Sequence, residues 1–173
     1  MRLYSKSFLI FVLSLIIFNC SSKSDKEYFD EALQKIKEKK YAEALNNFDY
    51  LLKNYPESKY APQSLYEIAK LYHAQLLSNI SKEESLKKAV NYYKKIFYEY
   101  KNSPEAERAL FVSGFIFAHE LNQLDSAKYN YELFLKNYPG SELAQSVKLE
   151  LENLGVSPDE ILTKKMKSNV NKN

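Results

Sequence analysis

One stretch, Asn-Tyr-Pro-Glu-Ser-Lys-Tyr-Ala at residues 54–61, decides the fold because it occurs three times. It returns as Asn-Tyr-Pro-Gly-Ser-Glu-Leu-Ala at 137–144 and, more loosely, as Glu-Tyr-Lys-Asn-Ser-Pro-Glu-Ala at 99–106. Each copy has a Tyr, then a Ser three residues later and an Ala three residues after that. Proline lacks an N–H and ends the helix behind it, and the Ser is a good N-cap for the next helix. A helix stop and start that recurs along the chain predicts an array of stacked helices.

Between and around these turns the sequence predicts one helix after another. Ser24, Ser81 and Ser157 each stand three residues before a Glu, which is the spacing of a capping box. All five prolines fall in turns or first helical turns, where proline is tolerated. No alternating strand pattern competes with this interpretation. The predicted helices are 26–39, 41–54, 60–79, 82–101, 104–121, 124–138 and 141–154, with a short one at 158–167.

The first nineteen residues have the pattern of a secretory signal peptide. Arg2 and Lys6 precede an apolar run from Phe8 to Phe18, interrupted by Ser14. A bilayer-spanning helix needs about 20 residues, so this run is too short to be one. An ordinary signal peptide beside an unrelated cysteine is one interpretation of the segment. The second interpretation depends on the residues at which the apolar run ends.

The run ends in Ile17-Phe18-Asn19-Cys20, which resembles the bacterial lipobox, although Phe18 and Asn19 are larger than its usual small residues. The resemblance implies that Cys20 becomes the lipid-modified first residue, carrying at least two acyl chains, and two chains anchor a protein stably. The Ser that follows is similar to the pattern for outer-membrane sorting. We therefore expect a lipoprotein signal peptide at 1–19, a lipidated Cys and polar tether at 20–25, and a protein held on the outer membrane facing the periplasm.

Charge and motif content argue against several other classes of function. Without the first nineteen residues the chain holds 25 − 2 = 23 cations and 22 acids, so it lacks the basic footprint of a nucleic-acid-binding protein. His73 and His119 are its two histidines and Cys20 its one cysteine, with no metal-ligand spacing among them. No phosphate loop or nucleophile elbow is present. We expect no enzyme activity, no metal, no cofactor and no small-molecule substrate.

Small residues recur along the predicted helices at a nearly fixed interval. Two pairs are 12 and 13 residues apart, and a third pair is 20 apart, which leaves an insertion of 20 − 12 = 8 residues around 73–85. The three pairs are Ala32–Ala44, Gly114–Ala127 and Ala69–Ala89. This spacing resembles the tetratricopeptide repeat, in which two antiparallel helices cross at small residues, and the resemblance covers 26–155. It implies an all-α, antiparallel helix-pair solenoid of about three repeats with a C-terminal capping helix.

The lengthened turn of 54–61 resembles one subgroup of these repeats. That subgroup occurs in envelope proteins of the BamD type, which are outer-membrane assembly lipoproteins, and of the YbgF type, which are Tol–Pal-associated periplasmic coordinators.

Within the predicted helix 104–121, Gly114 requires a structural reason, because glycine inside a helix costs about 1 kcal/mol relative to alanine. We expect a close approach of the partner helix at Ala127.

The repeat resemblance also places a concave, partner-binding face on the first helix of each pair. The residues that it projects there are Lys26, Phe29, Leu33, Ile36, Gln63, Tyr66, Lys70, His73, Arg108, Phe111, Phe115 and His119. Those that we expect to bind a partner are Phe29, Tyr66, Lys70, His73, Arg108, Phe111 and Phe115. For Phe111 and Phe115 a place in the core is the equal alternative, and a surface role is favoured for Tyr66, Lys70 and Arg108.

The function that these features indicate is a lipid-anchored scaffold that binds protein partners in the cell envelope, with outer-membrane protein assembly as the leading role. The alternatives are a Tol–Pal-linked coordinator of constriction and wall synthesis, a docking accessory of a cell-wall enzyme, and glycan binding through exposed tyrosines. Residues 156–173 are expected to form a short helix and a basic tail, which either is solvated or touches anionic surfaces. The tail contains Lys164, Lys165, Lys167 and Lys172.

Overall fold

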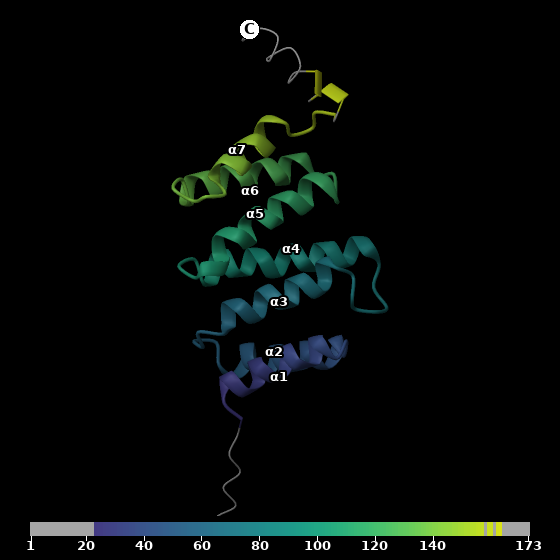
Figure 1. Ribbon diagram of the computed structural model, residues 1–173, viewed down its shortest axis with the longest axis vertical. Coiled ribbons are helices and arrows are strands. Elements are labelled where there is room, and N and C mark those ends of the chain that lie inside the picture. The colour runs from purple at the N-terminus through teal and green to yellow at the C-terminus, as the bar shows by residue number, and fades with distance from the viewer. Residues whose placement is uncertain (1–22, 158, 161, 164–173) are drawn as a thin grey trace, which may run out of the picture.

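The computed structural model describes residues 23–157, 159–160 and 162–163. Within these residues the chain is all-helical, and the helices follow one another along a single long axis (Figure 1). They are α1 (Asp25–Lys37), α2 (Tyr41–Asn54), α3 (Ala61–His73), α4 (Lys82–Glu99), α5 (Pro104–His119), α6 (Leu124–Asn137) and α7 (Ala144–Glu152). The predicted signal peptide, Cys20 and the lysines of the tail lie outside the described residues.

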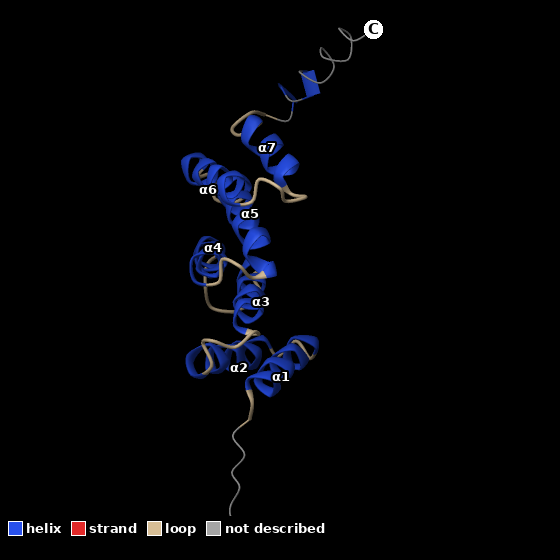
Figure 2. Ribbon diagram, turned by 90° about the vertical axis from the view of Figure 1, so that its left-hand side faces the viewer, coloured by secondary structure: helices blue, strands red, loops and turns tan. Residues whose placement is uncertain are grey.

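The helices form two layers. Figure 2 shows α2, α4 and α6 on one side of the array and α1, α3, α5 and α7 on the other. Consecutive helices pack as the pairs α1–α2, α3–α4 and α5–α6, and α7 packs on α6. The predicted fold class, an all-α solenoid of three helix pairs followed by a capping helix, is confirmed.

The three recurring turns have one geometry. Tyr55, Tyr100 and Tyr138 are the C-caps of α2, α4 and α6, with φ between −134° and −130° and ψ between 45° and 56°. In each turn the Ser N–H donates to the Tyr carbonyl, and the Ala N–H donates to the Ser carbonyl. A chain with the same short pattern therefore folds back in the same way three times.

The serines of these turns do not cap the next helix as predicted. α3 begins three residues after Ser58, and the Ser58 hydroxyl accepts instead from the Tyr60 N–H at 3.0 Å. Ser141 does the same for Leu143 at 3.1 Å. Ser103 stands at the N-cap of α5, but its hydroxyl is buried and has no hydrogen-bond partner among the described residues. No side-chain cap bond forms at this N-cap.

The turn tyrosines connect one turn to the turn before it. The phenol of Tyr100 donates to the carbonyl of Pro56 at 2.8 Å, and the phenol of Tyr138 donates to the carbonyl of Lys101 at 3.1 Å. The phenol of Tyr55 makes the corresponding bond to Lys23 at 2.9 Å. Each acceptor directly follows the preceding turn tyrosine or, for Tyr55, precedes α1. Successive turns along this edge are therefore held in register by side-chain hydrogen bonds.

The helix α3 ends earlier than predicted, at His73 instead of residue 79. Gln75 adopts a positive φ of 55°, and the N–H of Leu76 bonds back to the carbonyl of Leu71. This left-handed residue and six-to-one bond are the usual end of a helix. The loop 74–81 that results contains the insertion predicted from the wide spacing of Ala69 and Ala89.

Both ends of the array are closed by polar side chains. In α3, Leu65, Ala69 and Tyr72 are buried, four, eight and eleven residues after Ala61. The first two corresponding residues of α7, counted from Ala144, are Lys148 and Glu152, and both are exposed, whereas the third position falls beyond the end of α7. On this face α7 has no apolar stripe for a further partner helix. α7 is therefore the C-terminal cap.

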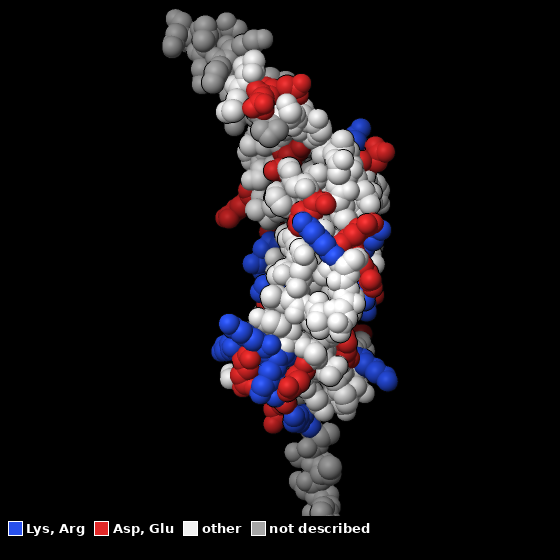
Figure 3. Space-filling model, turned by 90° about the vertical axis from the view of Figure 1, so that its right-hand side faces the viewer, with Lys and Arg blue, Asp and Glu red and all other residues white. Residues whose placement is uncertain are grey.

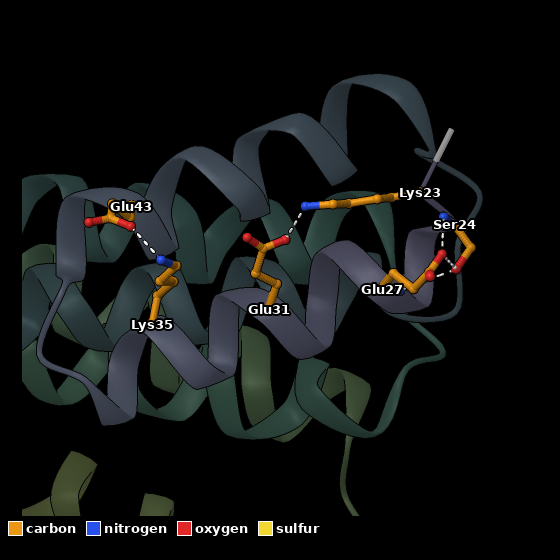
Figure 4. Close-up of polar contacts among 6 residues, drawn as sticks. All are labelled: Lys23, Ser24, Glu27, Glu31, Lys35 and Glu43. Atoms are coloured by element: carbon orange, nitrogen blue, oxygen red, sulfur yellow. Dashed lines mark hydrogen bonds and ion pairs between the residues drawn. The ribbon is translucent and has the colours of Figure 1, made fainter. Parts of the chain in front are cut away.

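The N-terminal end is polar in the same way. Ser24 and Glu27 form a complete capping box at the start of α1 (Figure 4). Glu31 pairs with Lys23, and Lys35 pairs with Glu43 of α2 at 2.6 Å. Ser157 and Glu160 also form both bonds of a capping box, as predicted, whereas at Ser81 only one of the two bonds forms, in which the Glu84 N–H donates to the Ser81 hydroxyl.

Candidate partner-binding face

The face formed by α1, α3, α5 and α7, which we call the odd-helix face, carries most of the predicted binding residues at its surface. Lys70, Arg108 and Phe115 are exposed, and Tyr66 and His73 are half-buried. Lys26, Gln63 and His119 are also exposed, whereas Leu33 and Ile36 pack partly against the core. The structure therefore brings α3 and α5 residues to one surface, as the repeat resemblance implied.

Phe29 is the exception and corrects the prediction. Its side chain is only 5% exposed, and its ring stacks on Tyr60 with the centroids 5.0 Å apart and lies 6.0 Å from Phe48. The turn before α3 brings Tyr60 over α1, which the sequence spacing could not show. Phe29 is a core residue and is unavailable to a partner.

Tyr66 and Arg108 form the central contact of the odd-helix face. The guanidinium carbon of Arg108 lies 5.7 Å from the centroid of the Tyr66 ring, within the range of a cation–π interaction. Beneath it, Tyr66 meets Tyr93 edge-on with the centroids 5.2 Å apart. Burial, followed by the neighbouring Tyr66, raises the pKa of Tyr93, so this phenol stays neutral. Within the described residues Arg108 makes no ion pair.

The two histidines join neighbouring helices of the same face. Nε2 of His73 lies 2.5 Å from Oε1 of Glu120 at the end of α5. Nε2 of His119 lies 2.7 Å from Oε2 of Glu150 in α7. Within α3, Lys70 pairs with Glu67 at 2.8 Å, a contact that helical spacing allows. No spacing rule could have found the two glutamates that meet the histidines, because these pairs are separated by 47 and 31 residues.

The alternatives for the two phenylalanines of α5 are resolved differently. Phe111 packs partly buried against Tyr131 and Phe134, with centroids 6.4 and 6.5 Å away, and belongs to the core. Phe115 is 38% exposed, and its ring lies 4.4 Å from that of His119. Of the two, Phe115 alone remains a surface residue.

A cleft of about 540 Å³ lies at the C-terminal end of this face. Its walls come from the end of α5, the start of α6, α7 and the segment up to Ser157. Leu124 and Leu149 line it, and no sequence motif marked either residue as a binding residue. The one sequence feature that the two leucines share is an apolar side chain close to a helix end, and many residues have this feature.

Residues 23–157 and the few described beyond them contain no group of three or more His, Cys, Asp and Glu side chains placed to hold a metal ion. Among the same residues, no helix combines the length and apolar character that a bilayer-spanning segment requires.

Comparison with known proteins identifies the repeat. The family model described as tetratricopeptide repeat matches residues 108–141, which include most of α5, all of α6 and the turn that follows. No curated protein matches the sequence. Repeats of this type mediate protein–protein contacts and are typically scaffolds rather than enzymes. The chain therefore contains a tetratricopeptide repeat within a capped, all-helical array, which is the architecture of a protein-interaction scaffold.

Proposed function

We propose that this chain is a lipid-anchored adaptor of the bacterial cell envelope that binds protein partners in outer-membrane protein assembly. The resemblance of residues 17–20 to a lipobox and that of the turns to the BamD-type and YbgF-type subgroup support this role. The polar caps at both ends also support it, because they limit the array to a short module that presents one face instead of growing by end-to-end stacking.

The single observation that carries the binding proposal is the Arg108 guanidinium held over Tyr66. Tyrosine and arginine are the residues most often found at binding hot spots. An arginine that stacks on an aromatic ring keeps its N–H donors free in a fixed plane, and such a fork matches a carboxylate. We infer that the partner presents an acidic side chain or a chain terminus to Arg108, in a segment that crosses α3 and α5.

The anchor is tested with Cys20→Ser. In cells, the wild-type chain should incorporate a labelled fatty acid and fractionate with membranes, whereas the variant should do neither. Retention of the variant on membranes to the same extent as wild type would contradict lipid anchoring through Cys20.

The envelope role is tested by cross-linking intact cells and identifying captured proteins by mass spectrometry, with Arg108→Ala as the specificity control. Recovery of outer-membrane assembly components that depends on Arg108 would support the proposed role. Recovery of Tol–Pal components or of a cell-wall enzyme would assign the scaffold to one of the alternative roles instead.

A further inference from the structure

The cleft at the C-terminal end has the size and lining of a binding site distinct from the Tyr66–Arg108 contact. Its volume of about 540 Å³ is within the range of about 300–1,000 Å³ usual for ligand sites. Leu149 is 48% exposed and Leu124 is 39% exposed, which is unusual for two leucines that line one concavity. Glu150 also lines the cleft, where it pairs with His119.

The surroundings of this cleft are acidic. Between residues 143 and 163 the described chain has a single cation, Lys148, and Glu120 at the end of α5 and Asp125 in the first turn of α6 add two acids. The acids of the first segment are Glu150, Glu152, Asp159 and Glu160. Figure 3 shows Asp and Glu side chains with few Lys or Arg towards this end of the molecule, whereas both signs mix at the opposite end. A ligand of this end must therefore match negative charge as well as apolar surface.

We propose that the cleft binds a lysine- or arginine-rich segment of a protein partner. Apolar side chains of the segment lie against Leu124 and Leu149, and its cations face Glu150 and the acids around it. Apolar contact supplies the affinity and charge complementarity selects the partner and its orientation. This proposal rests on the proposed function in one respect, namely that the ligand is a protein. The cleft has no residue in common with the Tyr66–Arg108 contact.

The chain offers an internal comparison for the charge requirement. A smaller cleft of about 290 Å³ lies at the other end of the array, between the α1–α2 turn and the loop 74–81. It also contains an exposed leucine, Leu76, at 41%, but its rim carries two lysines, Lys39 and Lys40, and one acid, Glu43. A basic segment should therefore avoid this second cleft although it also contains an exposed leucine.

The experiment measures the affinity of the full chain for two labelled fourteen-residue peptides by fluorescence anisotropy. Both peptides carry leucines on one helical face, and the other positions are lysine in one and glutamate in the second. The lysine peptide should bind, with an affinity that falls as salt is added, and the glutamate peptide should not. Leu149→Ser should weaken binding about tenfold, the loss expected when one apolar anchor is removed. Leu76→Ser should leave it unchanged.

The charge contribution is tested separately with Glu150→Gln, which should weaken binding of the lysine peptide by about two- to fivefold. Its matched control is Glu142→Gln, which changes an exposed acid before α7 that does not line the cleft.

Equal affinity of the wild-type chain for both peptides, or no loss of affinity in Leu149→Ser, would overturn the proposal. Carbodiimide cross-links from Lys164, Lys165, Lys167 or Lys172 to Glu150, together with no binding of either peptide, would assign the cleft to the chain's own tail and also overturn it. None of these outcomes affects capture through Arg108, so the two sites are tested independently.

Discussion

A Cβ atom placed on Gly114 would lie 2.5 Å from Cε1 and 2.7 Å from Cδ1 of Tyr131. The Tyr131 ring is fully buried and lies across the backbone of α5, four residues after Ala127 on α6. The sequence predicted a close approach at this glycine but attributed it to Ala127. The Tyr131 ring is what requires a glycine at position 114. The buried Ala127, on the same helix as Tyr131, permits the two helices to cross closely.

Gly114→Ala should lower the stability of the domain. Alanine ordinarily stabilises a helix by about 1 kcal/mol relative to glycine, whereas overpacking a core costs about 1–3 kcal/mol. Since the Tyr131 ring cannot move without displacing its buried neighbours, the second effect should prevail and the melting temperature should fall. Gly140→Ala is the matched control, because a Cβ there meets nothing within 4 Å. Equal melting temperatures for Gly114→Ala and wild type would show that the ring has room to shift.

The bonds between turns predict a loss of stability in Tyr100→Phe. The substitution keeps the ring and removes the phenol that donates to the Pro56 carbonyl at 2.8 Å. A hydrogen bond of this kind contributes about 0.5–1.5 kcal/mol, and the lower half of that range applies here because the bond is exposed. Urea denaturation followed by circular dichroism measures the change. Tyr41→Phe, which removes a phenol that makes no hydrogen bond within the described residues, should leave the midpoint where it is.

A pH-dependent contact connects the first helix to the first turn. The Ser58 hydroxyl donates to Oδ2 of Asp25 at 2.6 Å, and this bond, with the Lys26 N–H, lowers the pKa of Asp25 below its usual 3.8. A carboxyl whose pKa is lower in the folded state stabilises the fold above its unfolded pKa, and the contribution is lost as the pH falls through the folded value.

Ser58→Ala should therefore raise the pKa of Asp25 towards 3.8, as measured by NMR titration of the side-chain carboxyl. Glu27 serves as the internal control, because its pKa is lowered by Ser24 and not by Ser58. A variant in which both acids titrate as in wild type would show that the Ser58 bond does not form in solution.

Arg108→Ala should abolish recovery of the partner that binds the odd-helix face while leaving the melting temperature within error of wild type. Arg108 is exposed and makes no ion pair in the described chain, so its removal costs the fold little. Truncation of a binding hot spot costs about 2 kcal/mol or more. Tyr66 is less suitable as a test, because its ring packs against the core and its removal would also weaken the fold. Lys128→Ala, on the other layer of the array, is the control and should recover every partner.

Sequence patterns alone predict the order and pairing of the helices and the positions of the three turns, because each of these depends on residues close together in the chain. Proline and the Tyr-x-x-Ser-x-x-Ala pattern act within one turn, and the small residues of a pair are at most 20 positions apart. Local patterns of this kind are readable because a repeat array contains mostly contacts between adjacent elements.

Which side chains of those helices remain at the surface depends on packing between helices, and the sequence patterns did not reveal it. Phe29 and Phe111 occupy the same predicted face as Arg108 and Phe115, but Tyr60 covers the first and Phe134 packs against the second. His73 and His119 acquire their glutamates from 47 and 31 residues away. The helical period places a residue on a face, but its exposure depends on the height and tilt of the next helix, which is fixed by packing among side chains distant in the chain.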